Sequence, residues 1–279
     1  MSDLYFSEDD IDRLIVEDLP YGDLTTRALG IGQQIGRMTF RTRHPLVLCG
    51  AGIAARLITR LGGTVQSSLQ DGSHLESGVE VLTATGPVAS LQQAWKISQT
   101  VVDWASGIAT ATNAIVKAVQ SVNPSVRVAC ARKAPPGTRK LAIAAVQCGG
   151  AEMHRNGLSE TILIFPEHLI FMGENAIADA IAKARTQAPE RTVVIEVATQ
   201  SDAIAAAKAG AHVVQLEKFT PQDVRSVVLA VAGKCLIAAA GGIKADNAAH
   251  YAEAGAQILV TSAPYSAPPA EIKVEITHP

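Results

Sequence analysis

Residues 192–217 read TVVIEVATQSDAIAAAKAGAHVVQLE, and this stretch holds the unit that decides the fold. Two nearly continuous apolar runs, 192–197 and 212–217, flank an alanine-rich segment, 201–209, with helical character. Apolar runs of this kind are typical of parallel strands covered on both faces, and a helix between them makes a βα unit. Gly210 stands where a helix C-cap is expected. The stretch therefore predicts a strand, a helix and a parallel strand.

The same alternation extends over the carboxyl-terminal part of the chain. Expected strands cover 126–131, 162–165, 192–197, 212–217, 235–240 and 257–261, and expected helices cover 138–148, 174–187, 201–209, 221–231 and 245–254. Ala254-Gly255-Ala256 repeats the helix ending seen at Gly210. Such units either close into a barrel or form an open doubly wound sheet. Because no G-x-G-x-x-G fingerprint follows a strand, we favour the barrel.

Before residue 95, the expected strands and helices no longer alternate regularly. A helix is expected from Ser7, since Ser7 and Asp10 have the spacing of an N-cap and its partner. Strands are expected at 35–43 and 45–49, a helix at 51–61, one or two strands over 79–91, and a long helix over 95–121. Strands in close succession with one helix predict a compact α+β unit.

Composition narrows the class of protein. The chain has 279 residues, is 48% hydrophobic and carries a net charge of −2, which argues against disorder and against a general nucleic-acid binder. No apolar run reaches the roughly 18 residues of a membrane span. The amino terminus is acidic where a secretory signal is basic, and Cys49, Cys130, Cys148 and Cys235 form no C-x-x-C pair. We expect a soluble cytoplasmic protein with reduced thiols.

Polar residues gather at the expected strand ends, where βα barrels place their active sites. They are Arg132-Lys133, Glu167-His168, Glu196, Glu217-Lys218, Gly241-Gly242 and Thr261-Ser262, and His154-Arg155 lies in the loop that precedes the strand 162–165. Basic side chains bind carboxylate or phosphate, glutamates hold Mg²⁺ through oxygen, and glycine amides receive phosphate. Each feature alone is also typical of a solvated loop. Their common position at successive strand ends predicts a site for a polyanionic, metal-chelated substrate.

Several motifs, in order along nearly the whole chain, resemble the quinolinate phosphoribosyltransferase family. They are Glu17-Asp18, Gly22-Asp23-Leu24-Thr25-Thr26, Ser106-Gly107-Ile108-Ala109-Thr110, Ala131-Arg132-Lys133-Ala134-Pro135-Pro136-Gly137-Thr138-Arg139, Gly149-Gly150, His154-Arg155-Asn156-Gly157-Leu158, Glu196-Val197 and Gly241-Gly242-Ile243. The resemblance implies an α/β protein. Its amino-terminal α/β sandwich domain would span 1–105, joined by the tail 266–279, and its open α/β (TIM-like) barrel would span 106–265. It also implies a homodimer, or a higher even assembly, in which the neighbour closes each active site.

Other positions depart from the family pattern. Lys96 replaces an arginine on the long helix, Phe165 replaces a lysine that touches the quinolinate carboxylates, and Glu217-Lys218 replaces an Asp-Asn pair. Ala240 stands for the serine before Gly241-Gly242, and Met153 stands for the asparagine before His154. These departures resemble the ModD branch, pyrophosphorylases associated with molybdenum transport genes.

The resemblance implies a pentosyltransferase that uses phosphoribosyl pyrophosphate, Mg²⁺ and a small acceptor other than quinolinate. Glu196 and Glu217 would hold the metal and the ribose hydroxyls, and Lys133 would lie near the diphosphate. The acceptor would meet Lys96, Arg132, His154, Arg155 and Phe165, and the 5′-phosphate would meet Gly241, Gly242, Thr261 and Ser262.

Two hypotheses from other classes remain open at this stage. One is a Schiff-base aldolase-like barrel with Lys133 or Lys218 as the amine, which would need an apolar pocket to lower its pKa. The other is a non-catalytic anion or cofactor binder that takes part in molybdenum handling.

Overall fold

The computed structural model describes residues 4–279 and divides them into two compact units. Unit 1 takes residues up to 113, together with 135–150 and 266–279, and unit 2 takes 114–134 and 151–265. One continuous helix, α4 (Val88–Gln120), contributes to both units, so the boundary expected at residue 105 lies inside a helix. Among the described residues, no helix is long and apolar enough to cross a membrane.

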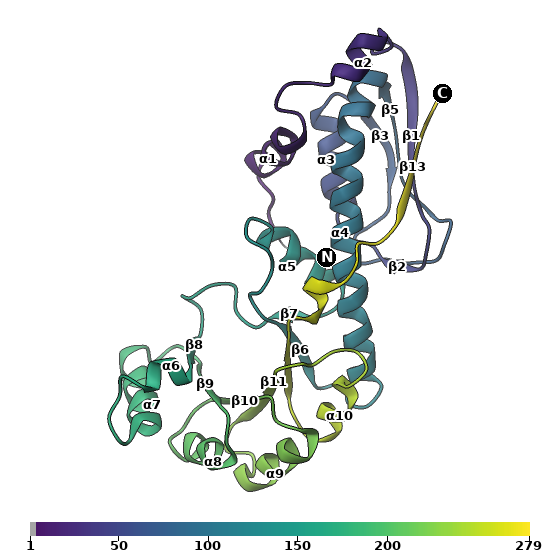
Figure 1. The fold of residues 1–279 in the computed structure, drawn as a ribbon. Helices are drawn as coiled ribbons and strands as arrows, with labels where there is room; N and C mark the ends of the chain where they lie inside the picture. Colours follow the sequence, from purple (N-terminus) through teal and green to yellow (C-terminus); the bar gives the residue numbers. More distant parts are fainter. Residues whose placement is uncertain (1–3) are drawn as a thin grey trace. The chain divides into compact units, whose positions relative to one another are not determined.

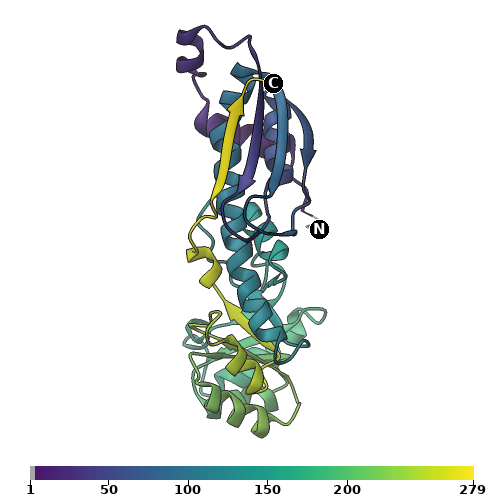
Figure 2. The same ribbon diagram turned by 90° about the vertical axis from the view of Figure 1, so that its right-hand side faces the viewer.

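Unit 1 is built on an antiparallel sheet of four strands in the order β13-β1-β5-β3, with β2 and β4 as a separate pair (Figure 1). Its strands are β1 (Ile35–Thr42), β2 (Leu46–Val47), β3 (Thr64–Ser68), β4 (His74–Leu75), β5 (Glu80–Pro87) and β13 (Ile272–Thr277). Its helices are α1 (Glu8–Asp18), α2 (Leu24–Leu29), α3 (Ala51–Arg60), the first part of α4, and α5 (Arg139–Cys148). The carboxyl-terminal strand β13 pairs with β1, as Figure 2 shows.

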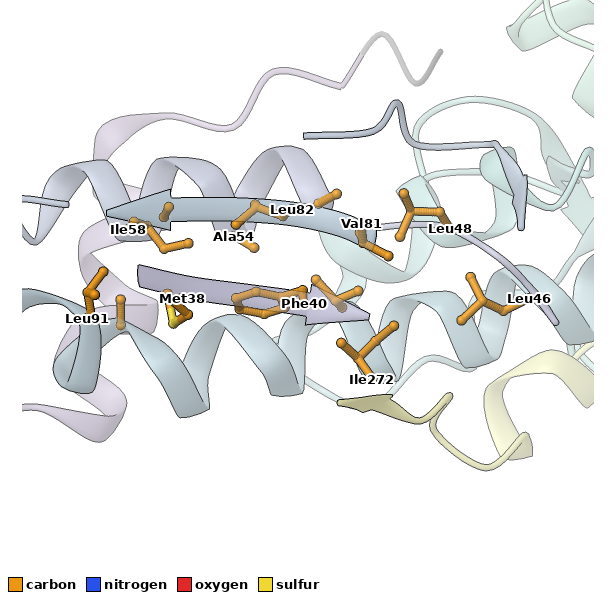
Figure 3. Packing of buried hydrophobic residues seen from close by; sticks show 14 residues of the cluster. Met38, Phe40, Leu46, Leu48, Ala54, Ile58, Val81, Leu82, Leu91 and Ile272 are labelled. Atoms are coloured by element: carbon orange, nitrogen blue, oxygen red, sulfur yellow. The ribbon is translucent and has the colours of Figure 1, made fainter. Parts of the chain in front are cut away.

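The core of unit 1 follows from period-two burial along β1. Gly36, Met38, Phe40 and Thr42 are buried, whereas the residues between them are exposed or half-buried. Met38 and Phe40 meet Ile58 of α3, Leu91 of α4 and Ile272 of β13 in one apolar cluster (Figure 3). A strand with one apolar face is stable only when another layer covers that face, and here α3 and α4 supply it.

Part of the expectation for residues 79–91 was wrong. The strand expected there ends at Pro87, and residues 88–91 are the first turn of α4 rather than strand. The amides of Val88 and Ala89, which a helix leaves without internal partners, donate to the carbonyls of Gln34 and Gly32. The helix can start early because a distant loop satisfies these donors. The helix predicted from Ser7 is confirmed, with Ser7 and Asp10 bonded as expected.

The segment Ser106–Thr110 of α4 holds the chain that precedes α3. The Ser106 hydroxyl accepts from the amide of Cys49 at 3.0 Å and donates to its carbonyl at 3.1 Å. The Thr110 hydroxyl accepts from the amide of Val47 at 2.9 Å. A Cβ on Gly107 would lie 2.3 Å from the carbonyl oxygen of Pro268, so only glycine lets the carboxyl-terminal tail approach the helix.

Unit 2 is a half-barrel of seven strands in the order β7-β6-β12-β11-β10-β9-β8, and every neighbouring pair is parallel. Its strands are β6 (Arg127–Cys130), β7 (Glu152–Met153), β8 (Ile162–Ile164), β9 (Val193–Val197), β10 (Val213–Glu217), β11 (Leu236–Ala240) and β12 (Ile258–Thr261). Its helices are α6 (Pro166–Leu169), α7 (Ala176–Gln187), α8 (Gln200–Lys208), α9 (Pro221–Val231), α10 (Ala248–Glu253) and the 3₁₀ turn Ala263–Ser266.

The half-barrel confirms the expected architecture of α/β units on a parallel sheet. Consecutive strands from β8 to β12 lie side by side, as in a barrel and unlike a doubly wound sheet. Gly210 and Gly255 follow helix ends with φ of +88° and +97°, the conformation expected of them. Small and β-branched side chains such as Val194, Val213 and Ala238 fill the interior.

Candidate active site

A cavity of about 610 Å³ lies at the carboxyl ends of the strands of unit 2. Every residue of unit 2 to which the family resemblance gave a role lines it, whereas the neighbouring His168 and Lys218 do not. The lining residues with such a role are Arg132, Lys133, His154, Arg155, Phe165, Glu196, Glu217, Gly241, Gly242, Thr261 and Ser262. Parallel strands present their carboxyl ends at one edge, which is why residues up to 130 positions apart in the chain share this wall.

The basic wall comes from the ends of β6 and β7. The amide of His154 donates to the carbonyl of Cys130 at 2.9 Å, which aligns the two strand ends. Arg155 is only 9% exposed, and burial followed by the nearby Arg132 charge lowers its pKa from the ordinary value. Burial, and then Arg155, also lower the pKa of His154, which favours its neutral imidazole. The wall therefore offers two guanidinium groups and one imidazole.

Phe165 forms an aromatic wall directly after β8. Its amide donates to Nδ1 of His168 at 2.9 Å, and the two rings stack with centroids 5.9 Å apart. The guanidinium carbon of Arg155 lies 6.0 Å from the centre of the Phe165 ring. A cation at this distance from an aromatic face is attracted to it. Arg155 and Phe165 together present a charge beside a flat apolar surface.

The acidic wall consists of Glu196 on β9 and Glu217 on β10. Gln215, which is 4% exposed, donates from Nε2 to Oε2 of Glu196 at 2.6 Å. Burial raises the pKa of Glu196, the nearby Glu217 and Glu167 raise it further, and Lys133 opposes them. A partly buried carboxylate beside other carboxylates gains stability when a cation joins it.

These carboxylates fit a Mg²⁺ ion that is shared with a substrate. Within residues 4–279, no group of three or more His, Cys, Asp or Glu side chains is arranged to hold a metal ion by itself. Mg²⁺ is commonly bound by one or two carboxylates together with substrate phosphates and water, rather than by a complete protein cage. Glu196 and Glu217, whose charges repel each other, are the two carboxylates that could supply the protein's share of such a site.

The loop after β11 takes a conformation that requires glycine. Gly241 and Gly242 have φ of +92° and +77°. A Cβ on Gly241 would lie 2.9 Å from the amide nitrogen of Lys218 and 3.0 Å from Oε1 of Glu217. The hydroxyl of Thr261, which is 4% exposed, donates to the carbonyl of Ile243 at 2.6 Å and so holds the loop. Successive backbone amides in a tight turn can form a concave site for an anion, and this glycine turn lies at the cavity wall.

Lys96 is not part of this cavity wall. It is exposed on α4 within unit 1, where its ammonium lies 4.1 Å from the centre of the Trp95 ring and 3.3 Å from Oε1 of Gln99. Glu167, one of the strand-end residues noted in the sequence, also lines the cavity, whereas sequence reasoning missed the polar residues Gln215 and Lys244 of the wall. Gln215 had a usable signal, since it is the one polar residue inside the apolar run of β10 and lies two positions before Glu217, on the same face.

Comparisons with known proteins agree along the whole chain. The family model described as quinolinate phosphoribosyl transferase, C-terminal domain, matches residues 108–275, and that of the N-terminal domain matches 23–106. A protein of Rhodobacter capsulatus named pyrophosphorylase ModD is 47% identical over 238 residues, covering 85% of this chain and 92% of that protein. Its namesake in Escherichia coli O157:H7 is 38% identical over 277 residues, covering 98% of both.

Solved structures give the same result for the fold. NadC from Streptococcus pyogenes is 25% identical, covers 99% of both chains and superposes with a TM-score of 0.91. The nicotinate-nucleotide pyrophosphorylase of Francisella tularensis is 25% identical, covers 98% of both chains and has a TM-score of 0.90.

Proposed function

The chain belongs to the quinolinate phosphoribosyltransferase family of pentosyltransferases, and we propose that it transfers ribose 5-phosphate to an acceptor other than quinolinate. The donor is phosphoribosyl pyrophosphate. The observation that carries the proposal is a single cavity in which arginines, an acidic pair and a glycine loop converge. These are the three kinds of group that such a donor and an anionic acceptor require.

The donor spans the acidic wall and the glycine loop. Glu196 and Glu217 hold Mg²⁺ and the ribose hydroxyls, and Lys133 lies near the diphosphate. The 5′-phosphate binds at Gly241, Gly242 and Ser262, in the loop that Thr261 holds. When bound, Mg²⁺ neutralises charge on the diphosphate and so makes it a better leaving group.

Transfer replaces the bond from the ribose C1 to diphosphate by a bond from C1 to the acceptor. Positive charge develops at C1 as the leaving bond lengthens, and Glu196 and Glu217 are the carboxylates that stabilise it. Diphosphate departs with both electrons of the broken bond, and Lys133 balances its charge. Catalysis comes from orientation and charge stabilisation rather than from a protein nucleophile.

The acceptor binds at the basic and aromatic walls. Arg132 and Arg155 grip its anionic group, His154 in its favoured neutral form offers a hydrogen bond, and the Phe165 ring supports a flat face. Quinolinate carries two carboxylates, and a buried carboxylate without a partner is costly. Phe165 contributes no charge, so we propose an acceptor with fewer negative charges and an aromatic or apolar face.

The direct test incubates the protein with phosphoribosyl pyrophosphate, Mg²⁺ and a panel of acceptors, followed by phosphorus NMR. We expect diphosphate release with a mono-acid or neutral heterocycle and weak release with quinolinate. Loss of one charged partner typically costs about 2–5 kcal/mol, so quinolinate should be at least about 30-fold poorer in kcat/KM. Binding without diphosphate release from any acceptor would favour a non-catalytic binder instead.

Phe165→Lys tests the acceptor wall separately. Adding an ammonium group beside Arg155 should raise kcat/KM for quinolinate about tenfold, or roughly 1.4 kcal/mol, and lower it for the preferred acceptor. Phe165→Leu is the matched control, because it removes the ring without adding charge. Equal quinolinate kinetics in both variants would show that Phe165 does not select the acceptor.

A Schiff-base mechanism has less support from the same geometry. Lys133 and Lys218 are both exposed, and Lys218 does not line the cavity. An amine that forms Schiff bases needs burial in an apolar pocket to lose its proton. Borohydride trapping with a keto substrate should therefore leave the protein unlabelled, and a stable adduct on either lysine would overturn this choice.

We also propose that the protein assembles as a homodimer or a higher even oligomer in which Lys96 reaches the neighbour's site. Most soluble oligomers are symmetric and use the same surface on each copy. Light scattering at micromolar concentration should give at least twice the 29.1 kDa chain mass. A monomer that retained full transferase activity would sink both parts of the proposal.

The physiological role that we propose is in molybdenum handling, on the likeness to proteins named ModD. Deleting the gene should raise the molybdate concentration that cells need for full molybdoenzyme activity, and restoring it should reverse the change. Identical molybdate requirements with and without the gene would exclude this role.

A further inference from the structure

Unit 1 contains a second cavity of about 610 Å³, formed by residues that the transferase proposal does not use. Its wall includes Cys49, Asp71 and Cys148, and its rim includes Tyr5 and Arg56. Cys49 lies just before α3 and is 1% exposed, whereas Cys148 ends α5 and is half-buried. Two cysteines that are 99 positions apart in the sequence thus open onto one cavity.

Both cysteines are held against the same helix, α4. The Ser106 hydroxyl binds the amide and the carbonyl of Cys49. Next to Cys148, a Cβ on Gly149 would lie 2.5 Å from Cβ of Thr112, and Asn113 donates to the Gly149 carbonyl at 3.2 Å. The backbone at Cys49 and the backbone next to Cys148 are therefore both bonded to α4, at positions about two helical turns apart. Fixed neighbours react with each other at a high effective concentration.

The two thiols line the same cavity and interact with each other. A hydrogen bond joins them, and it raises the pKa of Cys49 and lowers that of Cys148. Cys148 is therefore the sulfur with more thiolate character, and it is also the more exposed of the two. An accessible thiolate with a second thiol beside it is the arrangement of an oxidisable cysteine and its resolving partner.

A metal ion does not fit the pair. The described residues contain no group of three or more His, Cys, Asp or Glu side chains arranged to hold one. The third polar group of the cavity, Asp71, is bonded to the backbone amides of Gly50, Ala51 and Gly52 at the start of α3. Asp71 is therefore engaged by the backbone at the start of α3, and its charge raises the pKa of both thiols without supplying a third metal ligand.

We propose that Cys49 and Cys148 are an oxidisable pair that closes into a reversible intramolecular disulfide when a small oxidant enters the cavity. With a peroxide, the Cys148 thiolate attacks one oxygen, the O–O bond breaks and a sulfenic acid forms. The Cys49 thiol then displaces that oxygen as water. Two thiols lose two electrons and two protons, and the peroxide is reduced to two molecules of water or to water and an alcohol. A dithiol restores the starting state by exchange.

The other two cysteines provide a comparison within the chain. Cys130 is buried, and burial raises its pKa to about 12. Cys235 is half-buried, and burial raises its pKa too. A thiol with a raised pKa and no adjacent thiol reacts slowly with peroxides. Indiscriminate oxidation would reach Cys235 at least as readily as Cys49, which is almost completely buried.

The experiment titrates the intact protein with hydrogen peroxide, blocks remaining thiols with iodoacetamide and maps peptides without reduction. We expect a peptide that links Cys49 to Cys148, formed at least about tenfold faster than oxidation at Cys235 and removed by dithiothreitol. Stepwise oxidation of Cys148 to sulfinic acid without the linked peptide would overturn the proposal, as would equal reaction at Cys235. This readout needs no transferase activity, so it fails or succeeds independently of the proposed function.

A pair of variants assigns the two roles. Cys49→Ala should stop at the sulfenic acid, and dimedone should then label Cys148. Cys148→Ala should leave Cys49 unlabelled, because Cys49 is 1% exposed and its burial still raises its pKa when the hydrogen bond with Cys148 is lost. The matched control, Cys235→Ala, should form the linked peptide at the rate of the unmodified protein. Dimedone labelling of Cys49 in the Cys148→Ala variant would contradict the order of attack.

Discussion

The two cavities have the same volume, about 610 Å³, but a buried carboxyl group has different partners in each of them. Each contains a carboxyl group whose pKa is raised by burial, Glu196 in unit 2 and Asp71 in unit 1. Asp71 accepts from three backbone amides and completes the start of α3. Glu196 accepts from Gln215 and faces two further carboxylates.

The difference shows that a raised pKa does not by itself mark a catalytic residue. A carboxylate whose lone pairs are occupied by backbone amides stabilises the fold, because those amides would otherwise lack partners. A carboxylate that faces like charges retains the capacity to bind a cation. Asp71 is therefore expected to matter for folding and Glu196 for ligand binding, and the predictions that follow separate these roles.

The largest expected effect is on the transferase. Replacing Glu196 and Glu217 together by Gln should lower kcat/KM by at least about 10³-fold, because it removes the charges that hold Mg²⁺ and stabilise C1. It should also abolish the Mg²⁺-dependent rise in melting temperature caused by phosphoribosyl pyrophosphate. Glu190→Gln, an exposed change outside the cavity, is the matched control. An unchanged thermal shift in the double variant would refute the assignment.

Asp71→Ala should act on stability instead. Removing the acceptor leaves the first amides of α3 buried without a partner, at a cost of about 2 kcal/mol in the free energy of unfolding. Asp71→Asn keeps one acceptor oxygen and should cost less. Urea unfolding measures both, and kcat/KM should stay within about twofold of the unmodified protein. If the Asn variant lost as much stability as the Ala variant, the amide contacts would not explain the role of Asp71.

The glycine loop offers a matched pair with a smaller difference. Ala at Gly241 or Gly242 carries the same penalty for a left-handed backbone, about 1 kcal/mol. Only at Gly241 does the new methyl group collide with Lys218 and Glu217. Gly241→Ala should therefore be less stable than Gly242→Ala by about 1 kcal/mol, measured by urea unfolding. Equal stabilities would mean that the loop can move away from β10.

The smallest effect is a pH dependence of Mg²⁺ binding. Because the pKa of Glu196 is raised, protons compete with the metal at acidic pH, and Mg²⁺ affinity should rise as pH increases through that pKa and then level off. The change between about pH 5 and about pH 8 should stay below about tenfold per pH unit, as for one proton. Calorimetric titration with phosphoribosyl pyrophosphate measures it. Glu196→Gln should flatten the curve.

Local sequence patterns correctly predicted the strands that are buried on both faces, because burial there requires a continuous run of apolar residues. The strands around 193–197, 213–217 and 236–240 and the helices between them lie within two residues of their expected bounds. Shorter elements escaped prediction. β3 and β4 are mostly exposed, and β7 has two residues, so they carry little periodicity. Their hydrogen-bonding partners lie far away in the chain, and no local window contains them.

The sequence by itself predicted the parallel strands of unit 2 and the strand-end residues from Arg132 to Ser262 that line the cavity, because parallel strands carry their carboxyl ends to one edge. Only the tertiary structure decided which polar groups are already engaged. No local sequence pattern predicts that Asp71 caps α3 or that Gln215 binds Glu196. The same holds for the interaction of Cys49 with Cys148, which lie 99 positions apart in the chain. Contacts of this kind depend on packing between elements, and whether a polar group is left for chemistry depends on its bonded neighbours.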